Sequence, residues 1–169
     1  MSESGREPPA GVPSGEVLDG ETFRRLLGLE ASRAIRYQDF FALCLVRPDQ
    51  VNPTERPSET LAQTVARKIA EFVRSSDVVG RLDEGIGVLL LHAASGDALS
   101  VAQRLRSQIG NVRFQAEPAG TVRKITLSVG EVSFPRDGHN ESILLSRVRA
   151  CLEKAIRSGG NRVVPADNG

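Results

Sequence analysis

The sequence predicts one mixed α+β domain, in which a central β-sheet is flanked by helices. Stretches with apolar residues at helical spacing alternate with shorter apolar runs of strand length, and two of these runs follow each other directly as a hairpin. The length of 169 residues favours a single domain with a real core. Hydrophobic residues at 40% and charged residues at 25% are ordinary for a globular protein.

Charge and targeting signals narrow the expected partners and location. A net charge of +1 gives no bulk electrostatic reason to expect a nucleic acid polymer or an anionic membrane as partner. The N-terminus lacks the apolar region of a signal peptide, and no apolar stretch reaches the length of a membrane span. Cys44 and Cys151 lie in apolar runs without metal-ligand spacing, which favours reduced core thiols. We expect a cytoplasmic protein without membrane insertion.

Composition sets the expected domain boundaries. Residues 1–16 are rich in Pro, Gly, Ser and Glu, which predicts a disordered tail. The folded domain is expected over 17–165, followed by a flexible C-terminus at 166–169.

The first half of the domain reads as helix, strand, helix. Asp19 is placed to cap a helix that runs to about residue 36, and Phe40–Val46 is an apolar run typical of a buried strand. A proline-rich loop is expected at 47–57, and a second helix from near Ser58.

A β-hairpin is predicted next. Asp77–Leu82 and Ile86–His92 have the composition of strands, and only Asp83, Glu84 and Gly85 separate them. We expect Gly85 to supply a positive φ at the turn.

The remaining elements complete a sheet that we expect to carry its helices on one face. Gly–Gly at 159–160 is a strong signal for the end of the last helix. The expected elements are a helix over Gly96–Ile109, a short edge strand at Val112–Phe114, a loop at 115–122, a strand over Lys124–Phe134, a helix from Asn140, and a last strand at Asn161–Val164.

Four ordered blocks of the sequence resemble the GGDEF (diguanylate cyclase) domain family. They are Arg74-Ser75-Ser76-Asp77-Val78-Val79-Gly80-Arg81-Leu82 with the apolar strand Val88–Leu91, Ala102–Arg106, Ile125-Thr126-Leu127-Ser128-Val129-Gly130, and Gly159-Gly160-Asn161-Arg162-Val163. The resemblance covers about residues 18–165 and implies a nucleotide-cyclase-like sheet with a β-hairpin at the former active site.

The resemblance also implies that the catalytic residues are missing. Cyclases of this family join two GTP molecules with divalent metal ions held by carboxylates. The signature positions G-G-[DE]-[DE]-F fall here on Asp83, Glu84, Gly85, Ile86 and Gly87, so that the carboxylate positions hold Gly85 and Ile86. In addition, Val46 lies at or beside a metal position, and Ile156 replaces a phosphate-binding lysine. We therefore expect no cyclase activity, no metal and no cofactor.

One family site is retained by spacing. Arg74 and Asp77 reproduce the R-x-x-D motif, five residues before the signature, with which many cyclases bind their product cyclic di-GMP, and Arg104 aligns with a second arginine used there by some members. An arginine fork and an aspartate can read the edges of guanine. The alternative is a purely structural pair, with Arg74 at a helix end and Asp77 capping a turn.

Two functions remain open at this stage, and a third is disfavoured. The first is a cyclic di-GMP receptor that relays the signal to an unidentified signalling protein, with which a ligand-linked dimer would be compatible. The alternative is a nucleotide-independent interaction scaffold that uses the acidic hairpin tip and the first helix. Residual GTP binding or turnover is disfavoured by the substitutions at the signature.

Overall fold

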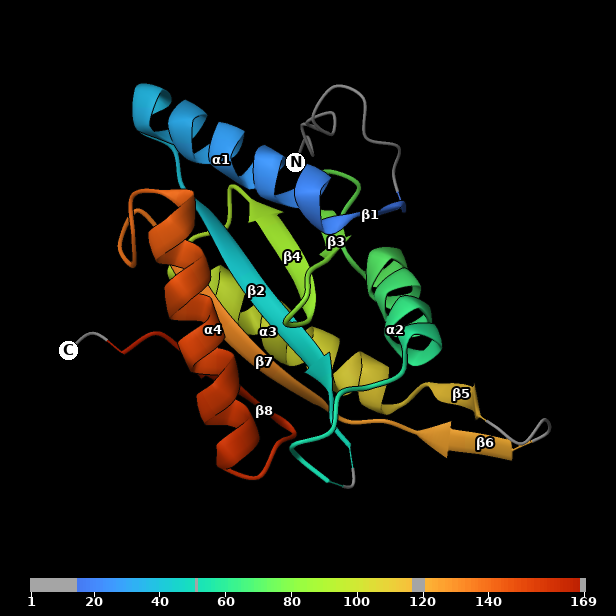
Figure 1. Cartoon of the computed structure of the whole chain (residues 1–169). Helices are drawn as coiled ribbons and strands as arrows, with labels where there is room; N and C mark the ends of the chain where they lie inside the picture. The colour runs from blue at the N-terminus through green and yellow to red at the C-terminus, as the bar shows by residue number, and fades with distance from the viewer. Residues whose placement is uncertain (1–14, 51, 117–120, 168–169) are drawn as a thin grey trace.

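The computed structural model describes residues 15–50, 52–116 and 121–167, and these form a mixed α+β domain as predicted (Figure 1). In chain order the elements are β1 (Val17–Leu18), α1 (Gly20–Tyr37), β2 (Phe41–Pro48), α2 (Glu59–Phe72), β3 (Val78–Arg81), β4 (Ile86–Leu91), α3 (Ser95–Gly110), β5 (Arg113–Ala116), β6 (Thr121–Lys124), β7 (Leu127–Phe134), α4 (Glu141–Arg157) and β8 (Arg162–Pro165).

The central sheet has the strand order β1-β3-β4-β2-β7-β8. Strand β2 lies in the middle and is antiparallel to both β4 and β7, while the outer pairs β1–β3 and β7–β8 are parallel. Side chains of β2, β4 and β7 are buried along nearly their whole length, because both faces of the sheet are covered by helices. The two-residue strand β1 was not predicted from the sequence.

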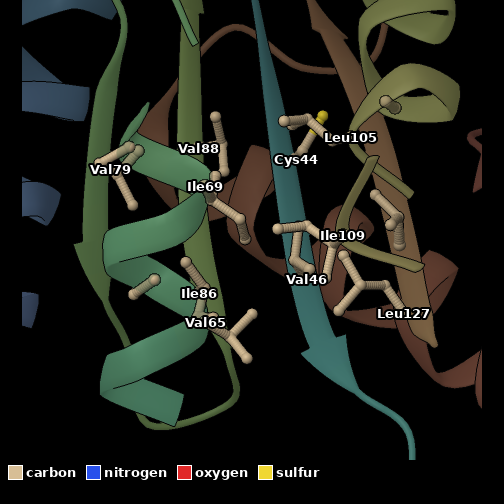
Figure 2. Close-up of a cluster of buried hydrophobic side chains, with 14 of the residues drawn as sticks. Cys44, Val46, Val65, Ile69, Val79, Ile86, Val88, Leu105, Ile109 and Leu127 are labelled. Atoms are coloured by element: carbon tan, nitrogen blue, oxygen red, sulfur yellow. The ribbon is translucent and has the colours of Figure 1, made fainter. Parts of the chain in front are cut away.

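The helices cover both faces of the sheet, so the expectation of helices on one face was wrong. Helices α2 and α3 pack on one face, around Val65, Ile69 and Leu105, and part of this apolar cluster is shown in Figure 2. Helices α1 and α4 pack on the other face, around Phe23 and Leu152. A strand that is buried on both faces of the sheet has apolar side chains on both, so the sequence pattern could not show which face each helix covers.

A second hairpin corrects the prediction for residues 112–134. Strands β5 and β6 pair with each other, with Arg113 opposite Lys124 and Ala116 opposite Thr121, and form a separate two-stranded sheet. Figure 1 shows this hairpin projecting beyond the end of α3. The predicted loop at 115–122 is therefore largely strand where it is described, and the single predicted strand divides into β6 and β7.

Three of the helices begin where the sequence predicted, at Asp19, which was expected to be a cap, and at Ser58 and Asn140, which were expected only as helix starts. Asp19 Oδ1 accepts a hydrogen bond from the Thr22 N–H at 2.8 Å, Ser58 Oγ accepts from Leu61 at 3.1 Å, and Asn140 Oδ1 accepts from Ile143 at 2.9 Å. Each bond satisfies an N–H group that the helix itself leaves unpaired. After α4, Gly159 and Gly160 have φ of 113° and 72°, a conformation that favours glycine.

The predicted tail falls mostly outside the described residues, since the description begins at Gly15. Its predicted disorder and the domain boundaries at 16 and 165 stay predictions. Among the residues described, no helix combines the length and apolarity needed to cross a bilayer.

Candidate functional site

The predicted hairpin is present, and its turn is tight. Strands β3 and β4 are joined across Leu82 and Gly85, whose main chains exchange two hydrogen bonds of 2.8 and 3.3 Å. Gly85 does not have the predicted positive φ. Instead, a Cβ atom at this position would lie 2.6 Å from the main-chain oxygen of Val46 on β2. Gly85 is thus required by the close approach of two backbones and not by the turn conformation.

The two acidic residues at the tip contact helices of the α1–α4 face. Glu84 Oε1 lies 2.8 Å from Arg149 Nη2 on α4, and Asp83 Oδ2 lies 3.8 Å from Arg24 Nη2 on α1. The Asp83 side chain is 89% exposed, so its contact with Arg24 is weak, whereas the Glu84 side chain is mostly covered.

The last two signature positions belong to the core. Ile86 is 1% exposed and packs in the cluster beneath α2. Gly87 lies under the ring of Phe23 from α1, since a Cβ atom on Gly87 would come within 2.7 Å of that ring. Helix α1 therefore places the Phe23 ring over Gly87, the position at which the family signature has a phenylalanine.

A catalytic divalent metal ion, which the resemblance implies, does not fit the residues at this hairpin. Gly85 and Ile86 have no side-chain oxygen, Val46 at the facing strand has none, and the nearby Glu84 carboxylate is paired with Arg149. No group of three or more acidic, histidine or cysteine side chains gathers as a metal site within the described ranges.

A pocket of about 390 Å³ lies beside the hairpin, between β2, the start of α2 and the turn. Three arginines contribute to its wall: Arg47 at the end of β2, Arg56 in the following loop and Arg81 on β3. Arg81 is held by Glu59 Oε2 at 2.9 Å and Gln63 Oε1 at 3.1 Å, both from α2. Three acidic residues, Glu59, Asp83 and Glu84, also line the pocket, so charges of both signs are present in its wall.

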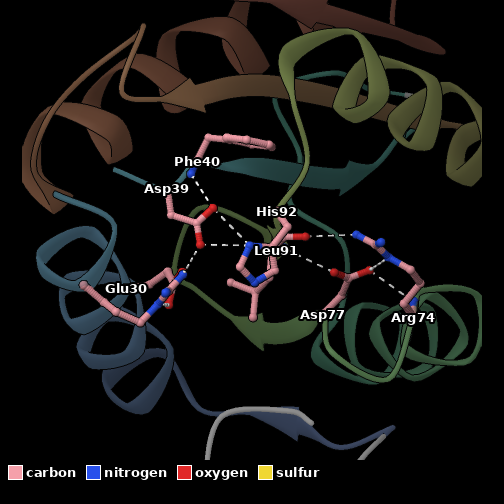
Figure 3. A network of polar contacts seen from close by, with 8 residues as sticks. Glu30, Asp39, Phe40, Arg74, Asp77, Leu91 and His92 are labelled. Atoms are coloured by element: carbon pink, nitrogen blue, oxygen red, sulfur yellow. Dashed lines mark hydrogen bonds and ion pairs between the residues drawn. The ribbon is translucent and has the colours of Figure 1, made fainter. Parts of the chain in front are cut away.

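The R-x-x-D pair lies at the opposite end of β4. Asp77 is 2% exposed at its side chain, and its Oδ2 accepts from the Arg74 main-chain N–H at 3.1 Å and lies 3.5 Å from Arg74 Nε. Its Oδ1 accepts from the Leu91 N–H at 3.3 Å, and Arg74 Nη2 donates to the Leu91 oxygen at 3.0 Å (Figure 3). The motif therefore fastens the end of α2 to the end of β4.

The two residues of the motif differ sharply in accessibility. Burial raises the pKa of Asp77, and the Arg74 charge and the N–H donors partly offset that effect. The Arg74 side chain is 59% exposed, so its guanidinium remains open to a ligand while it contacts Asp77. Arg104 is exposed on α3, the helix beside α2, and its side chain makes no hydrogen bond or ion pair with another described residue.

The same end of the sheet carries a second set of polar contacts, which the sequence did not indicate. His92, which follows β4 with φ of 57°, places Nδ1 2.9 Å from Asp39 Oδ2, and Arg33 Nη2 lies 2.7 Å from the same oxygen. Burial opposes ionisation of Asp39, but hydrogen bonds from Arg33, the Phe40 N–H and His92 outweigh it and lower its pKa to about 2. Figure 3 shows Leu91 and His92 between this cluster and the Arg74–Asp77 pair.

Asp49 is a polar junction that sequence reasoning treated as an ordinary loop residue. Its carboxylate accepts from Thr126 Oγ1 at 2.7 Å, Ser128 Oγ at 2.6 Å and the Asn161 N–H at 2.9 Å. It joins the end of β2 to β7 and to the turn before β8. The alternating hydroxyls at 126 and 128 were the available signal for such an acceptor.

Comparison with known proteins decides the family. The sequence matches the family described as "Diguanylate cyclase, GGDEF domain" over residues 57–162, which is more than half of the chain. This chain belongs to the GGDEF domain family. The four sequence blocks that suggested the relationship are thereby explained, and the fold agrees with it.

Solved structures of GGDEF domains show the same fold. The GGDEF domain of YfiN (also TpbB) from Pseudomonas aeruginosa is similar with a TM-score of 0.79 and 21% identity, over 92% of this chain and 99% of that one. The GGDEF domain of DgcB from Caulobacter crescentus, in complex with c-di-GMP, has a TM-score of 0.74 and 15% identity, over 95% and 98%.

A third similar structure includes a protein partner. The diguanylate cyclase SiaD from Pseudomonas aeruginosa, in complex with its activator SiaC, has a TM-score of 0.73 and 26% identity, over 92% of this chain and 61% of SiaD. GGDEF domains of this fold thus include one bound to c-di-GMP and one within a protein complex.

Proposed function

We propose that this GGDEF domain does not synthesise cyclic di-GMP but binds it, through Arg74 and Arg104, and passes the signal to a protein partner. The observation that carries the proposal is the Arg74 side chain, which is 59% exposed although it is fixed to Asp77 and Leu91. A preorganised, accessible guanidinium is suited to the guanine edge or to a phosphate.

Loss of synthesis follows from the hairpin. Neither Gly85 nor Ile86 can hold a metal ion by its side chain, and the space for a side chain at Gly85 is occupied by the Val46 oxygen. Metal-assisted charge stabilisation contributes several kcal/mol to a transition state of this kind, on the order of 3–4 kcal/mol for one donor. Without the carboxylates that hold the metal ions, we expect no turnover of GTP.

The two motif residues have different parts in the proposed binding. In the conformation described, both Asp77 oxygens already accept hydrogen bonds, so Asp77 positions Arg74 while Arg74 meets the ligand. Arg104 would approach the ligand from the neighbouring helix. A direct contact between Asp77 and guanine would require the Asp77 side chain, which is 2% exposed, to become accessible.

Calorimetric titration with cyclic di-GMP tests the proposal. At roughly tens of micromolar protein we expect measurable heat for the wild type, and a loss of at least about tenfold in affinity for Arg74→Ala and for Arg74→Lys, which keeps the charge but not the fork. Arg36→Ala, at an exposed arginine in the last turn of α1, is the matched control and should bind normally. Absence of heat, or binding that is indifferent to Arg74, would refute the proposal.

An interaction scaffold without nucleotide is the second candidate, and exposed apolar residues on α1 favour it. Leu29, Ile35 and Tyr37 are 61%, 59% and 66% exposed. Substitution of these residues or of Asp83 should then abolish partner binding in a pull-down, and added cyclic di-GMP should have no effect. A nucleotide-dependent pull-down would instead support the receptor.

A further inference from the structure

The β5–β6 hairpin is anchored to the domain by one face and presents the other to solvent. Phe114 on β5 is 4% exposed and belongs to the apolar cluster of the α2–α3 face. Successive residues of a strand point to opposite faces, so Arg113 and Gln115 lie on the other face. Their cross-strand partners are Lys124 and Val122, and all four side chains are exposed. We call these four residues the outer face of the hairpin.

Two cations are opposite each other on the outer face. Arg113 and Lys124 are direct cross-strand partners, and the Cβ atoms of such a pair lie only about 4.5–5.5 Å apart. Within the described residues, neither side chain has a hydrogen bond or an ion pair. Like charges directly opposite each other destabilise a β-ribbon, and no carboxylate in the described part of the chain offsets this pair.

The sequence around the hairpin has the same sign of charge. Between residues 98 and 130 the single acidic residue is Glu117, which lies outside the described residues, and the basic residues are Arg104, Arg106, Arg113, Arg123 and Lys124. Because the whole chain has a net charge of only +1, this stretch is a local excess of positive charge. The hairpin projects beyond the end of α3 (Figure 1), so a partner can reach its outer face without displacing other elements.

We propose that the outer face of the hairpin docks an acidic polypeptide segment that also carries apolar side chains. Carboxylates of the segment pair with Arg113 and Lys124 and remove the repulsion between them. Val122, which is 48% exposed beside Lys124 on the same face, contacts an apolar side chain of the segment. This apolar contact favours a polypeptide over a nucleic acid polymer, because phosphates would meet only the cations and the net charge of +1 provides no wider basic surface.

This inference names the class of partner that the proposed function leaves open, and it rests on that function only for its signalling role. The docking itself needs no nucleotide, because the two sites are far apart. Helix α3 begins four residues after Leu91, which binds Arg74, and its 16 residues carry the chain roughly 24 Å before β5 begins. Arg74→Ala should therefore abolish cyclic di-GMP binding and leave the docking intact, so failure of one proposal can be told from failure of the other.

Fluorescence anisotropy with a labelled synthetic peptide tests the docking. The probe is a short peptide in which Glu and Val alternate, and the same peptide with Gln in place of Glu is its control. We expect the acidic peptide to bind with a dissociation constant of roughly 10–1,000 µM at low salt, and more weakly as salt is raised. The double variant Arg113→Gln/Lys124→Gln should lose at least about fivefold in affinity, and Val122→Ser should also bind more weakly. Arg123→Gln, on the other face of the same hairpin, is the matched control and should change little.

Thermal unfolding of Lys124→Glu separates docking from a purely structural role. This change places opposite charges across from each other, so it should raise the Tm while it weakens the docking of the acidic peptide. A lower Tm would contradict the repulsion on which the proposal rests. The proposal is also overturned by absence of binding at about 1 mM peptide, by equal affinity for the Gln peptide, or by an equal loss in Arg123→Gln. Duplex DNA that binds at least as tightly as the acidic peptide at the same salt would overturn it in favour of a nucleic acid.

Discussion

The contact of Phe23 with two cross-strand glycines gives a sharp test of how α1 is seated on the sheet. Gly80 on β3 and Gly87 on β4 are opposite each other, and the fully buried Phe23 ring lies on both. Neither glycine has a positive φ, so alanine is opposed by neighbouring side-chain atoms, chiefly those of Phe23, and not by the backbone conformation. We expect Gly87→Ala to destabilise the domain by about 1–3 kcal/mol, the usual effect of overpacking.

The atoms involved predict that this effect depends on Phe23. A Cβ on Gly87 would lie 2.7 Å from Cε1 and Cζ of the ring, atoms that Phe23→Leu removes. The Phe23→Leu variant itself should lose roughly 1–2 kcal/mol. In that background Gly87→Ala should become neutral, or stabilising by up to about 1 kcal/mol, because alanine restricts the unfolded chain.

Gly80 provides the matched control. A Cβ on Gly80 would lie 2.7 Å from Cβ of Phe23, an atom that leucine retains. Gly80→Ala should therefore be destabilising in both backgrounds. Urea denaturation of the single and double variants measures the coupling directly. If Gly87→Ala lowers the unfolding free energy equally in the wild type and in the Phe23→Leu variant, the proposed seating of α1 is wrong.

Three further predictions concern carboxylates. Burial raises the pKa of Glu131 above 4.5, so stability is lost as pH rises through the folded pKa and the buried carboxyl ionises. Glu131→Gln should therefore raise the Tm at pH 7. Near pH 4, where Glu131 is protonated in the folded protein, the variant should have no such advantage. Asp49→Asn replaces a carboxylate that accepts three hydrogen bonds by a neutral amide with one acceptor oxygen, and it should lower the unfolding free energy by about 1–3 kcal/mol in urea. Because the pKa of Asp39 is lowered in the folded protein, the ionised carboxylate stabilises the fold above pH 3.8, and this stabilisation is lost as pH falls toward 2. Asp39→Asn should therefore make the unfolding free energy less dependent on pH between these two values.

Local signals in the sequence predicted the parts of the fold that local chemistry determines. Asp19, Ser58 and Asn140 each cap a helix through a bond to a residue three positions on, and the spacing around Asp83 was enough to predict a hairpin. These features depend on neighbours in the chain, so a single sequence carries them.

Features that depend on distant segments were missed or misjudged. Gly85 is required because β2 passes within 2.6 Å of its would-be Cβ, and no local pattern reports the position of Val46. The β5–β6 hairpin forms because two short segments outside the main sheet satisfy each other's main-chain groups.

The candidate site was predicted in part. The sequence placed Arg74 and Asp77 by spacing, but it could not show that Asp77 turns inward to Leu91 while Arg74 stays exposed. Likewise, no local pattern indicates that Glu84 pairs with Arg149, 65 positions away in the chain.

The most direct test of binding without conversion is one incubation of the protein with GTP, cyclic di-GMP and Mn²⁺. Protein-bound and free nucleotides are then separated by filtration and quantified by chromatography. We predict that cyclic di-GMP is retained with the protein, that GTP is not consumed, and that Arg74→Ala abolishes the retention. Consumption of GTP with formation of new cyclic di-GMP, or failure of the wild type to retain cyclic di-GMP, would contradict the account.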